Sequence, residues 1–171
     1  MEEIRLPIGV RRDGSYYTRV EWASTSENDP TFWVNNLIDD DLDRNGGTWG
    51  ANTETTADAI LSFFGEKQLL SEIHFYKNVG ITISVIEELA KKVNIYICDN
   101  DSPTSIKRKD NDINIASWQL IKTVDIVMEE GWQKVKLEQP VMAKYVRIEL
   151  VDNFCNEPKI PWVEMNEIKL F

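Results

Sequence analysis

The chain has 171 residues, a length typical of one domain, and 42% of its residues are hydrophobic and 10% aromatic. This composition predicts a packed globular domain that needs no disulfide framework. The formal net charge of −10 argues against nucleic acid and anionic membranes as partners, because binding a polyanion requires a field of lysine and arginine. We find neither an apolar run long enough for a membrane span nor a signal-peptide pattern.

Alternation of apolar and polar residues with a period of two predicts a series of strands. It is clearest in residues 144–151, where Val146, Ile148 and Leu150 are expected to face inward and Arg147 outward. The other expected strands lie at 58–65, 70–77, 92–99, 117–126, 132–139 and 166–171. Regular short strands separated by turns indicate an all-β fold, either a β-sandwich or a jelly roll, rather than alternating βα units.

The remaining segments complete one sandwich domain. Only residues 84–92 have helical spacing, so we expect at most one or two short helices. The polar stretch 99–116, interrupted by Pro103, is expected to be a long exposed loop. Residues 1–21 form either an N-terminal extension or a first strand, and residues 22–171 form the sandwich.

Few residues of the chain are suited to catalysis. Cys98 and Cys155 are far apart in the sequence and are expected to be small buried side chains. The sequence does not decide whether they form a disulfide with each other. His74 is the single histidine, so no Cys/His zinc site is possible. A motif that pairs a nucleophile with a base is absent, as is a phosphate-binding glycine loop. We therefore expect no enzymatic activity from this domain.

The stretch "NNLIDDDLDRNGGTWG" at 35–50 is the most unusual feature, because its aspartates would repel one another without a cation or solvent between them. Asp41, Asp43 and Asn45 match the first half of an EF-hand loop, but Asn52 stands where the bidentate Glu is required. Spacing alone leaves two interpretations open, an irregular calcium loop and a solvated acidic turn. Paired glycosidase carboxylates are less favoured, because neighbouring aspartates on a turn have no reason to flank a sugar.

The sequence also resembles a known family. "NNLIDDDLDRNGGTW", "SEIHFYKN", "KKVNIYICDND", "GWQKVKLEQPVMAKYVRIEL" and "PWVEMNEIKLF" resemble, in this order, stretches of the discoidin family, also called coagulation factor V/VIII type C domains. The likeness extends over residues 22–171 and is greatest to bacterial carbohydrate-binding modules of family 32. It implies a jelly-roll β-sandwich of the galactose-binding-domain type with one structural calcium ion.

The resemblance also implies a set of calcium ligands. The side chains would come from Asp39, Asp41, Thr48 and Glu167, and backbone carbonyls would come from near Asn36 and Met165. Such an ion would join an early loop to the last strand. This sequence departs from the family pattern at Asp40, which replaces the usual glycine. The loop is also longer than usual, so Asp43 or Asn45 could take the place of Asp41.

The family binds sugars on loops at one end of the sandwich, where an aromatic ring covers the apolar face of the sugar and polar groups bind its hydroxyls. In residues 152–162, Phe154 or Trp162 would supply the ring and Asn153 would bind a hydroxyl. His74 and Arg147 are the available candidates for the histidine and arginine that the family adds. A single histidine on a strand is more often a structural residue than a ligand contact, and Arg147 could equally be paired with a neighbouring carboxylate. Trp49, Trp118 and Trp132 are expected to pack within the fold.

The resemblance therefore implies a non-catalytic carbohydrate-binding module for terminal galactose or N-acetylhexosamine-type glycans. Such a module would be an accessory domain of a larger glycoside hydrolase, monomeric when isolated, and secreted, periplasmic or on the surface of a bacterium. The alternative is a protein-binding adhesion domain of the same family. Phospholipid binding is disfavoured by the net charge of −10.

Overall fold

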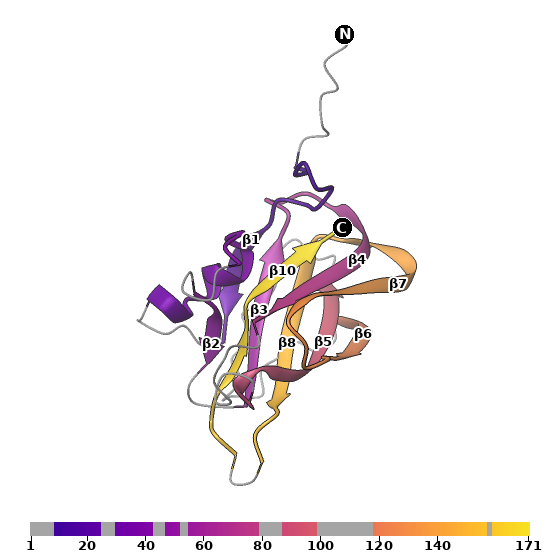
Figure 1. Cartoon of the computed structure of the whole chain (residues 1–171). Coiled ribbons are helices and arrows are strands. Elements are labelled where there is room, and N and C mark those ends of the chain that lie inside the picture. The colour runs from indigo at the N-terminus through magenta and orange to yellow at the C-terminus, as the bar shows by residue number, and fades with distance from the viewer. Residues whose placement is uncertain are drawn as a thin grey trace.

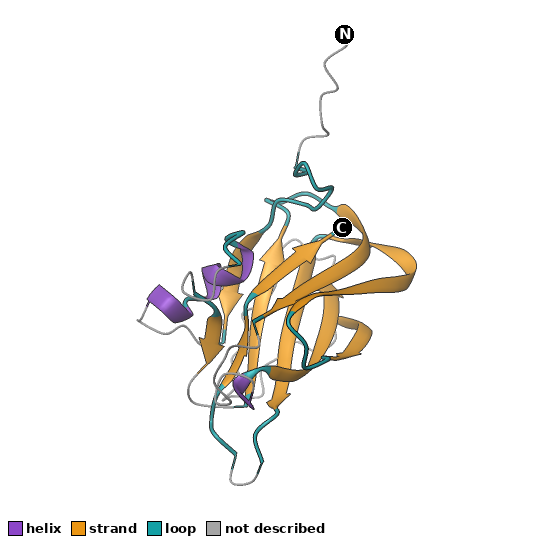
Figure 2. Cartoon of the chain, viewed as in Figure 1, coloured by secondary structure: helices purple, strands orange, loops and turns teal. Residues whose placement is uncertain are grey.

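The computed structural model describes residues 9–24, 30–42, 47–51, 55–78, 87–98, 118–156 and 159–171. Helix is confined to short segments (Figure 2). Figure 1 labels strands β1 to β8 and β10. Within the described ranges the elements are β1 (Arg19–Ala23), η1 (Pro30–Phe32), η2 (Val34–Ile38), β2 (Trp49–Ala51), β3 (Thr56–Ser62), β4 (Gln68–Lys77), β5 (Ala90–Cys98), β6 (Gln119–Asp125), β7 (Gly131–Ala143), β8 (Tyr145–Asn153), β9 (Val163–Met165) and β10 (Glu167–Leu170), where η marks a 3₁₀ helix.

The strands form two main antiparallel sheets that pack face to face. The larger sheet has the order β1-β3-β8-β5-β6 and the smaller has the order β10-β4-β7, with β2 and β9 forming a separate pair. Strands distant in the sequence are neighbours in both sheets, as expected of a jelly roll. The predicted all-β jelly-roll sandwich is therefore confirmed. No helix among the described residues is long and apolar enough to cross a membrane.

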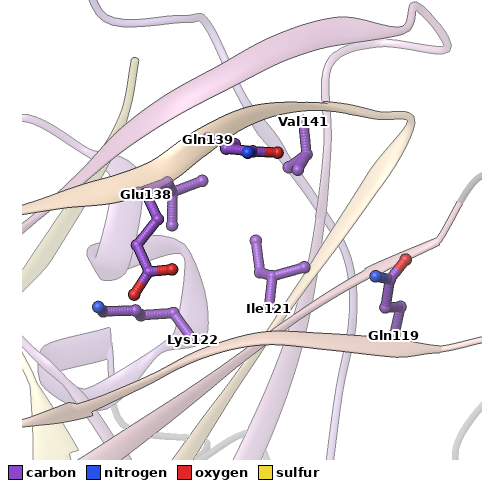
Figure 3. A pocket seen from close by; sticks show the side chains of 7 residues that line it. Gln119, Ile121, Lys122, Glu138, Gln139 and Val141 are labelled. Carbon is purple, nitrogen blue, oxygen red and sulfur yellow. The ribbon is translucent and has the colours of Figure 1, made fainter.

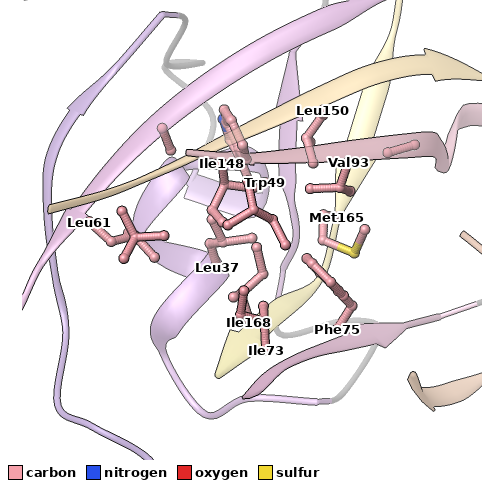
Figure 4. Close-up of a cluster of buried hydrophobic side chains, with 14 of the residues drawn as sticks. Leu37, Trp49, Leu61, Ile73, Phe75, Val93, Ile148, Leu150, Met165 and Ile168 are labelled. Carbon is pink, nitrogen blue, oxygen red and sulfur yellow. The ribbon is translucent and has the colours of Figure 1, made fainter. Parts of the chain in front are cut away.

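The core lies between the two sheets and follows the predicted alternation. On β8, Val146, Ile148 and Leu150 are fully buried, as the sequence predicted. Residues from both sheets and from the segments beside them meet here (Figure 4). Trp49, which was expected to be structural, is also fully buried. Burying such large apolar side chains contributes roughly 1.5–3 kcal/mol each to folding.

One prediction of secondary structure is wrong in part. Residues 84–92 were expected to be helical, but only Glu87 and Glu88 are helical within the described part of this segment, and β5 begins at Ala90. Pairing of β5 with both β6 and β8 overrides the weak helical preference of these residues. The predicted loop at 99–116 lies outside the described residues.

A second buried cluster lies on the outer face of the five-stranded sheet. It contains Ile60, Cys98, Trp118 and Tyr145, with Trp22 and Tyr96 packed against it. Trp118 is therefore buried, as expected, but it packs in this outer cluster and not between the two sheets. Cys98 and Cys155 are both buried and free, so they are not paired with each other.

Candidate functional site

The acidic loop lies directly beside the last strand. η2 ends at Ile38 and Asp39 is its C-cap residue. The backbone N–H of Asp40 donates a hydrogen bond of 3.2 Å to Oε1 of Glu167 on β10. The backbone N–H of Asp41 donates to Oδ1 of Asp39 at 2.9 Å. The structure therefore brings together the two segments that the sequence comparison had placed on opposite sides of an ion.

Glu167 has the most unusual environment in this loop. It is fully buried, and its Oε2 has no hydrogen-bond partner among the described residues. Burial, reinforced by the charges of Asp39 and Asp40, raises the pKa of Glu167 to about 9. A buried carboxylate needs either a proton or a cation, so this site would gain from a bound metal ion.

Other oxygen atoms line the same region. Thr48 Oγ1 donates a hydrogen bond of 2.8 Å to the carbonyl oxygen of Met165. These two oxygen atoms, both predicted as calcium ligands, are therefore neighbours. The side-chain amide of Asn36 donates hydrogen bonds to the carbonyls of Pro30 at 2.8 Å and Thr48 at 3.3 Å. This side chain thus connects the segments before and after the acidic loop.

The remaining predicted calcium ligands are placed less favourably. Asp41 is exposed, and Asp43 and Asn45 lie outside the described residues. In the part of the chain that the structure describes, no three Asp, Glu, His or Cys side chains form a metal-binding group. The available donors are carboxylate, hydroxyl and carbonyl oxygens, the types that suit calcium rather than zinc or copper.

The conformation and contacts of Asp40 explain why the family has a glycine at this position and how an aspartate is accommodated here. Its φ is 63°, the left-handed region that glycine adopts without strain. Its carboxylate forms ion pairs with Arg11 Nη1 at 2.7 Å and Lys169 Nζ at 3.0 Å. These contacts hold the strained residue in place and direct its charge toward two cations. Sequence reasoning missed Arg11 and Lys169, because no local pattern relates them to the acidic stretch.

The loop after β8 is organised by Asn153, which had been expected to bind a sugar hydroxyl. Asn153 is fully buried. Its Nδ2 donates to the carbonyls of Ile160 at 2.8 Å and Trp162 at 2.7 Å, and its Oδ1 accepts from the N–H of Cys155 at 3.1 Å. Because these bonds use the side-chain amide within the loop, Asn153 has a structural role and does not face a ligand.

Trp162 and Phe154 lie at the two ends of this loop. The half-buried indole of Trp162 packs edge-on against Phe32, with ring centroids 4.9 Å apart, and its Nε1 donates to Glu164 Oε2 at 2.9 Å. A Cβ atom at Gly50 would lie 2.5 Å from the Trp162 ring, so glycine permits this close approach. Phe154 is half-buried against the main core, and its N–H donates to the carbonyl of Glu87 at 2.9 Å.

Arg147 and His74 do not meet. Arg147 points outward from the five-stranded sheet and is 5% exposed, with its guanidinium 3.8 Å from the Tyr96 ring centroid. Its Nε lies 3.5 Å from Asp58 Oδ1. His74 is on β4 in the other sheet, and its Nε2 lies 2.8 Å from Glu72 Oε2. Because the two residues occupy outer faces of opposite sheets, they cannot contact one small ligand.

A groove between the edge strands β6 and β7 is visible in Figure 3. It has a volume of about 260 Å³ and is lined by Gln119, Ile121, Lys122, Leu137, Glu138, Gln139 and Val141. These side chains are aliphatic or polar, so the groove offers no aromatic face to a sugar ring.

Comparison with known proteins connects this geometry to a family of folds. No family model matches the sequence, and no curated protein matches it. A family 32 carbohydrate-binding module from Clostridium perfringens, solved with GalNAc-β-1,3-galactose, has a TM-score of 0.65 and 10% identity, covering 90% of this chain and 94% of that chain. The family 32 module of NanJ from the same organism, solved with galactose, has a TM-score of 0.63 and 11% identity, covering 90% and 92%.

A fucolectin from striped bass (Morone saxatilis) serum is also similar, with a TM-score of 0.63 and 13% identity over 90% of this chain and 46% of that chain. Identities this low establish a shared fold and leave the ligand to be argued from the site. The fold that the sequence resemblance implied is confirmed. The chain has the discoidin-like β-sandwich fold of the family 32 carbohydrate-binding modules.

Proposed function

We propose that this chain is a non-catalytic carbohydrate-binding module for terminal galactose or N-acetylhexosamine-type glycans, attached to a secreted or surface-located bacterial glycoside hydrolase. The observation that carries this proposal is the match over 90% of the chain to modules solved with GalNAc-β-1,3-galactose and with galactose. Glycan binding requires no catalytic group, which agrees with the absence of a nucleophile motif from the sequence.

The loop between β8 and β9 is the proposed glycan site. It lies at the end of the sandwich opposite the C-terminus (Figure 1). Trp162 is the ring best suited to a sugar, because Phe32 and Glu164 fix its orientation while part of its surface stays accessible. A ring held in place before binding loses little conformational entropy when the sugar packs against it. Phe154 is a second candidate from the same loop.

A structural calcium ion between the acidic loop and β10 is part of the proposal. Asp39 and Glu167 would supply carboxylates, Thr48 a hydroxyl, and Met165 and the region near Asn36 carbonyls. The buried, unpartnered Oε2 of Glu167 supports a cation at this place. The ion would neutralise a carboxyl pair and join two chain segments that are distant in sequence.

A glycan array probed with the fluorescently labelled chain in calcium buffer tests the glycan proposal. We expect selective binding to galactose- or N-acetylhexosamine-terminated glycans. Trp162→Ala should weaken this binding at least about tenfold, the equivalent of about 1.4 kcal/mol, whereas Trp162→Phe should retain part of it. Circular dichroism confirms that each variant is folded. Absence of binding at high protein concentration would contradict the proposal.

A protein-binding adhesion domain is the second candidate function, and one surface feature favours it. Phe64 is 62% exposed at the turn between β3 and β4, and the cross-strand neighbours Leu69 and Met142 are 47% and 52% exposed. Adjoining exposed apolar side chains such as Leu69 and Met142, and large exposed rings such as Phe64, are typical of protein contacts. Phe64→Ala is thus a matched control, because it should leave glycan binding intact and weaken only a protein interaction.

A further inference from the structure

The outer face of the three-stranded sheet carries a hollow that the proposed glycan site does not use. Its volume is about 290 Å³. We call it the sheet-face pocket, lined by Asp13, His74, Trp132, Lys134, Lys169 and Phe171. The strand register accounts for it, because Lys169 on β10 is paired with His74 on β4, and His74 with Lys134 on β7. The three side chains therefore form one row on the same face.

Aromatic rings form one side of the sheet-face pocket. The half-buried Trp132 was expected to pack within the fold, but the structure places it on this outer face. Its ring centroid lies 5.2 Å from that of Tyr76 and 6.4 Å from that of His74. His74 packs against Phe171 at 4.1 Å, and Glu72 holds its Nε2. These rings are thus fixed before any ligand binds.

The two lysines of the pocket differ in their partners. Lys169 lies 2.5 Å from Asp13 Oδ2 and 3.0 Å from Asp40 Oδ1, so its charge is already neutralised. Lys134 is exposed and forms no ion pair within the described ranges of the chain. Glu72, the one acid on β4, is hydrogen-bonded to His74, lies opposite Lys136 and also feels the charge of Lys134, without forming an ion pair with it. Lys134 is thus a positive charge available to a ligand.

We propose that the sheet-face pocket is a second carbohydrate site, which binds a single pyranose ring bearing a carboxylate. Trp132 would cover the apolar face of the sugar, and Lys134 would pair with its carboxylate. His74 Nδ1, which has no hydrogen bond to the rest of the described chain, would bind a hydroxyl. The volume lies near the lower end of small-ligand pockets, which run from about 300 Å³, and is matched to one ring. The inference rests on the proposed function in that it takes this domain to bind glycans.

Nuclear magnetic resonance titration of the ¹⁵N-labelled full chain tests the inference and suits weak binding. Sodium glucuronate is the probe, and glucose is its neutral counterpart. Glucuronate should shift the Trp132 indole N–H and the amides of His74 and Phe171, and glucose should shift them at least about fivefold less at equal concentration. Higher salt should weaken glucuronate binding, because the Lys134 charge is exposed.

Two variants separate the pocket from general electrostatic attraction. Lys134→Gln should weaken glucuronate binding at least about fivefold. Lys92→Gln, which removes another exposed lysine, from β5 in the opposite sheet, should change it less than twofold. Equal effects of the two variants, equal binding of glucose and glucuronate, or shifts confined to residues 152–162 would each overturn the inference.

The outcomes also distinguish this inference from the proposed function. Galactose-type binding on the array without glucuronate shifts at Trp132 overturns the inference and leaves the proposed function standing. Glucuronate shifts at Trp132 with a negative array support the sheet-face pocket and overturn the site between β8 and β9. Absence of both signals overturns both.

Discussion

Glu167 combines full burial with a carboxylate oxygen that has no partner among the described residues, next to the exposed carboxyl of Asp39. This arrangement predicts opposite effects of pH with and without calcium. The pKa of Glu167 is raised from 4.5 to about 9 in the folded chain, so the folded state binds the extra proton. That stabilisation is complete below pH 4.5 and is lost as the pH rises to about 9.

In a chelator, the free energy of unfolding measured in urea should therefore fall between pH 5 and 8, by at most about 1.4 kcal/mol per pH unit from this one proton. With calcium the decrease should vanish, because the ion displaces the proton and binds more tightly as the pH rises. Glu167→Gln should remove both the pH dependence and the stabilisation by calcium. Equal stability with calcium and with chelator at pH 8 would rule out the ion.

At calcium about one hundred times the dissociation constant, the ion should add about 2.7 kcal/mol to the stability at pH 8. Thermal unfolding with calcium, magnesium and chelator measures this effect. Magnesium should stabilise less, because it requires a smaller octahedral site and releases its water reluctantly. Asp41→Asn, at the exposed neighbouring position, tests whether that side chain takes part, and an unchanged calcium effect would remove it from the ligand set.

Asp40 allows the backbone conformation to be separated from its ion pairs. Asp40→Ala removes the pairs with Arg11 and Lys169 and leaves a non-glycine residue at φ 63°. Asp40→Gly removes the same pairs but relieves the strain, so it should be more stable than the alanine variant by roughly 1 kcal/mol in urea unfolding. Equal stability of the two variants would show that the left-handed conformation costs nothing here.

At the scale of elements, the loop between β8 and β9 depends on one buried amide. Asn153→Ala would leave the carbonyls of Ile160 and Trp162 and the N–H of Cys155 without their partner. We expect a loss of roughly 3 kcal/mol in the free energy of unfolding, since each buried unsatisfied group costs about 1–3 kcal/mol. Asn156→Ala, at an exposed position of the same loop, is the control and should be nearly neutral.

The Asn153→Ala and Asn156→Ala variants also test whether the loop conformation is needed for glycan binding. If the loop holds Trp162 in position, Asn153→Ala should weaken glycan binding even at temperatures where the variant is fully folded. Glycan binding of wild-type strength in a folded Asn153→Ala variant would show that the loop conformation does not matter to the ligand.

At the scale of the whole molecule, the reactivity of the two buried thiols shows whether the domain unfolds in one cooperative step. Cys98 lies in the outer cluster of the five-stranded sheet and Cys155 in the loop after β8, so they sample different regions. Burial and the nearby Glu87 raise the pKa of the Cys155 thiol, which further slows its reaction. Both should stay unlabelled by a thiol reagent in buffer and become labelled at the urea midpoint seen by circular dichroism. Labelling of Cys155 well below that midpoint would reveal separate opening of the loop.

The structural features that the sequence alone predicted correctly are those that depend on the pattern of neighbouring residues along the chain. Alternation with a period of two placed Val146, Ile148 and Leu150 in the core and Arg147 outside, because successive side chains of any strand point to opposite faces. The order of the strands along the chain and the composition sufficed for the fold class. The resemblance of short stretches to a known family also predicted that the acidic loop lies next to Glu167.

What the sequence could not determine depends on long-range pairing. Arg147 and His74 both point outward, but only the arrangement of β8 and β4 in different sheets shows that they are on opposite sides of the molecule. Asn153 could equally have faced solvent, until the path of its loop placed two carbonyls next to its amide. Trp132 was expected inside and joins Lys134 and His74 at a surface pocket instead. Strand periodicity determines on which side of its own strand a residue lies, whereas the neighbours that it meets there are determined only when distant segments pack together.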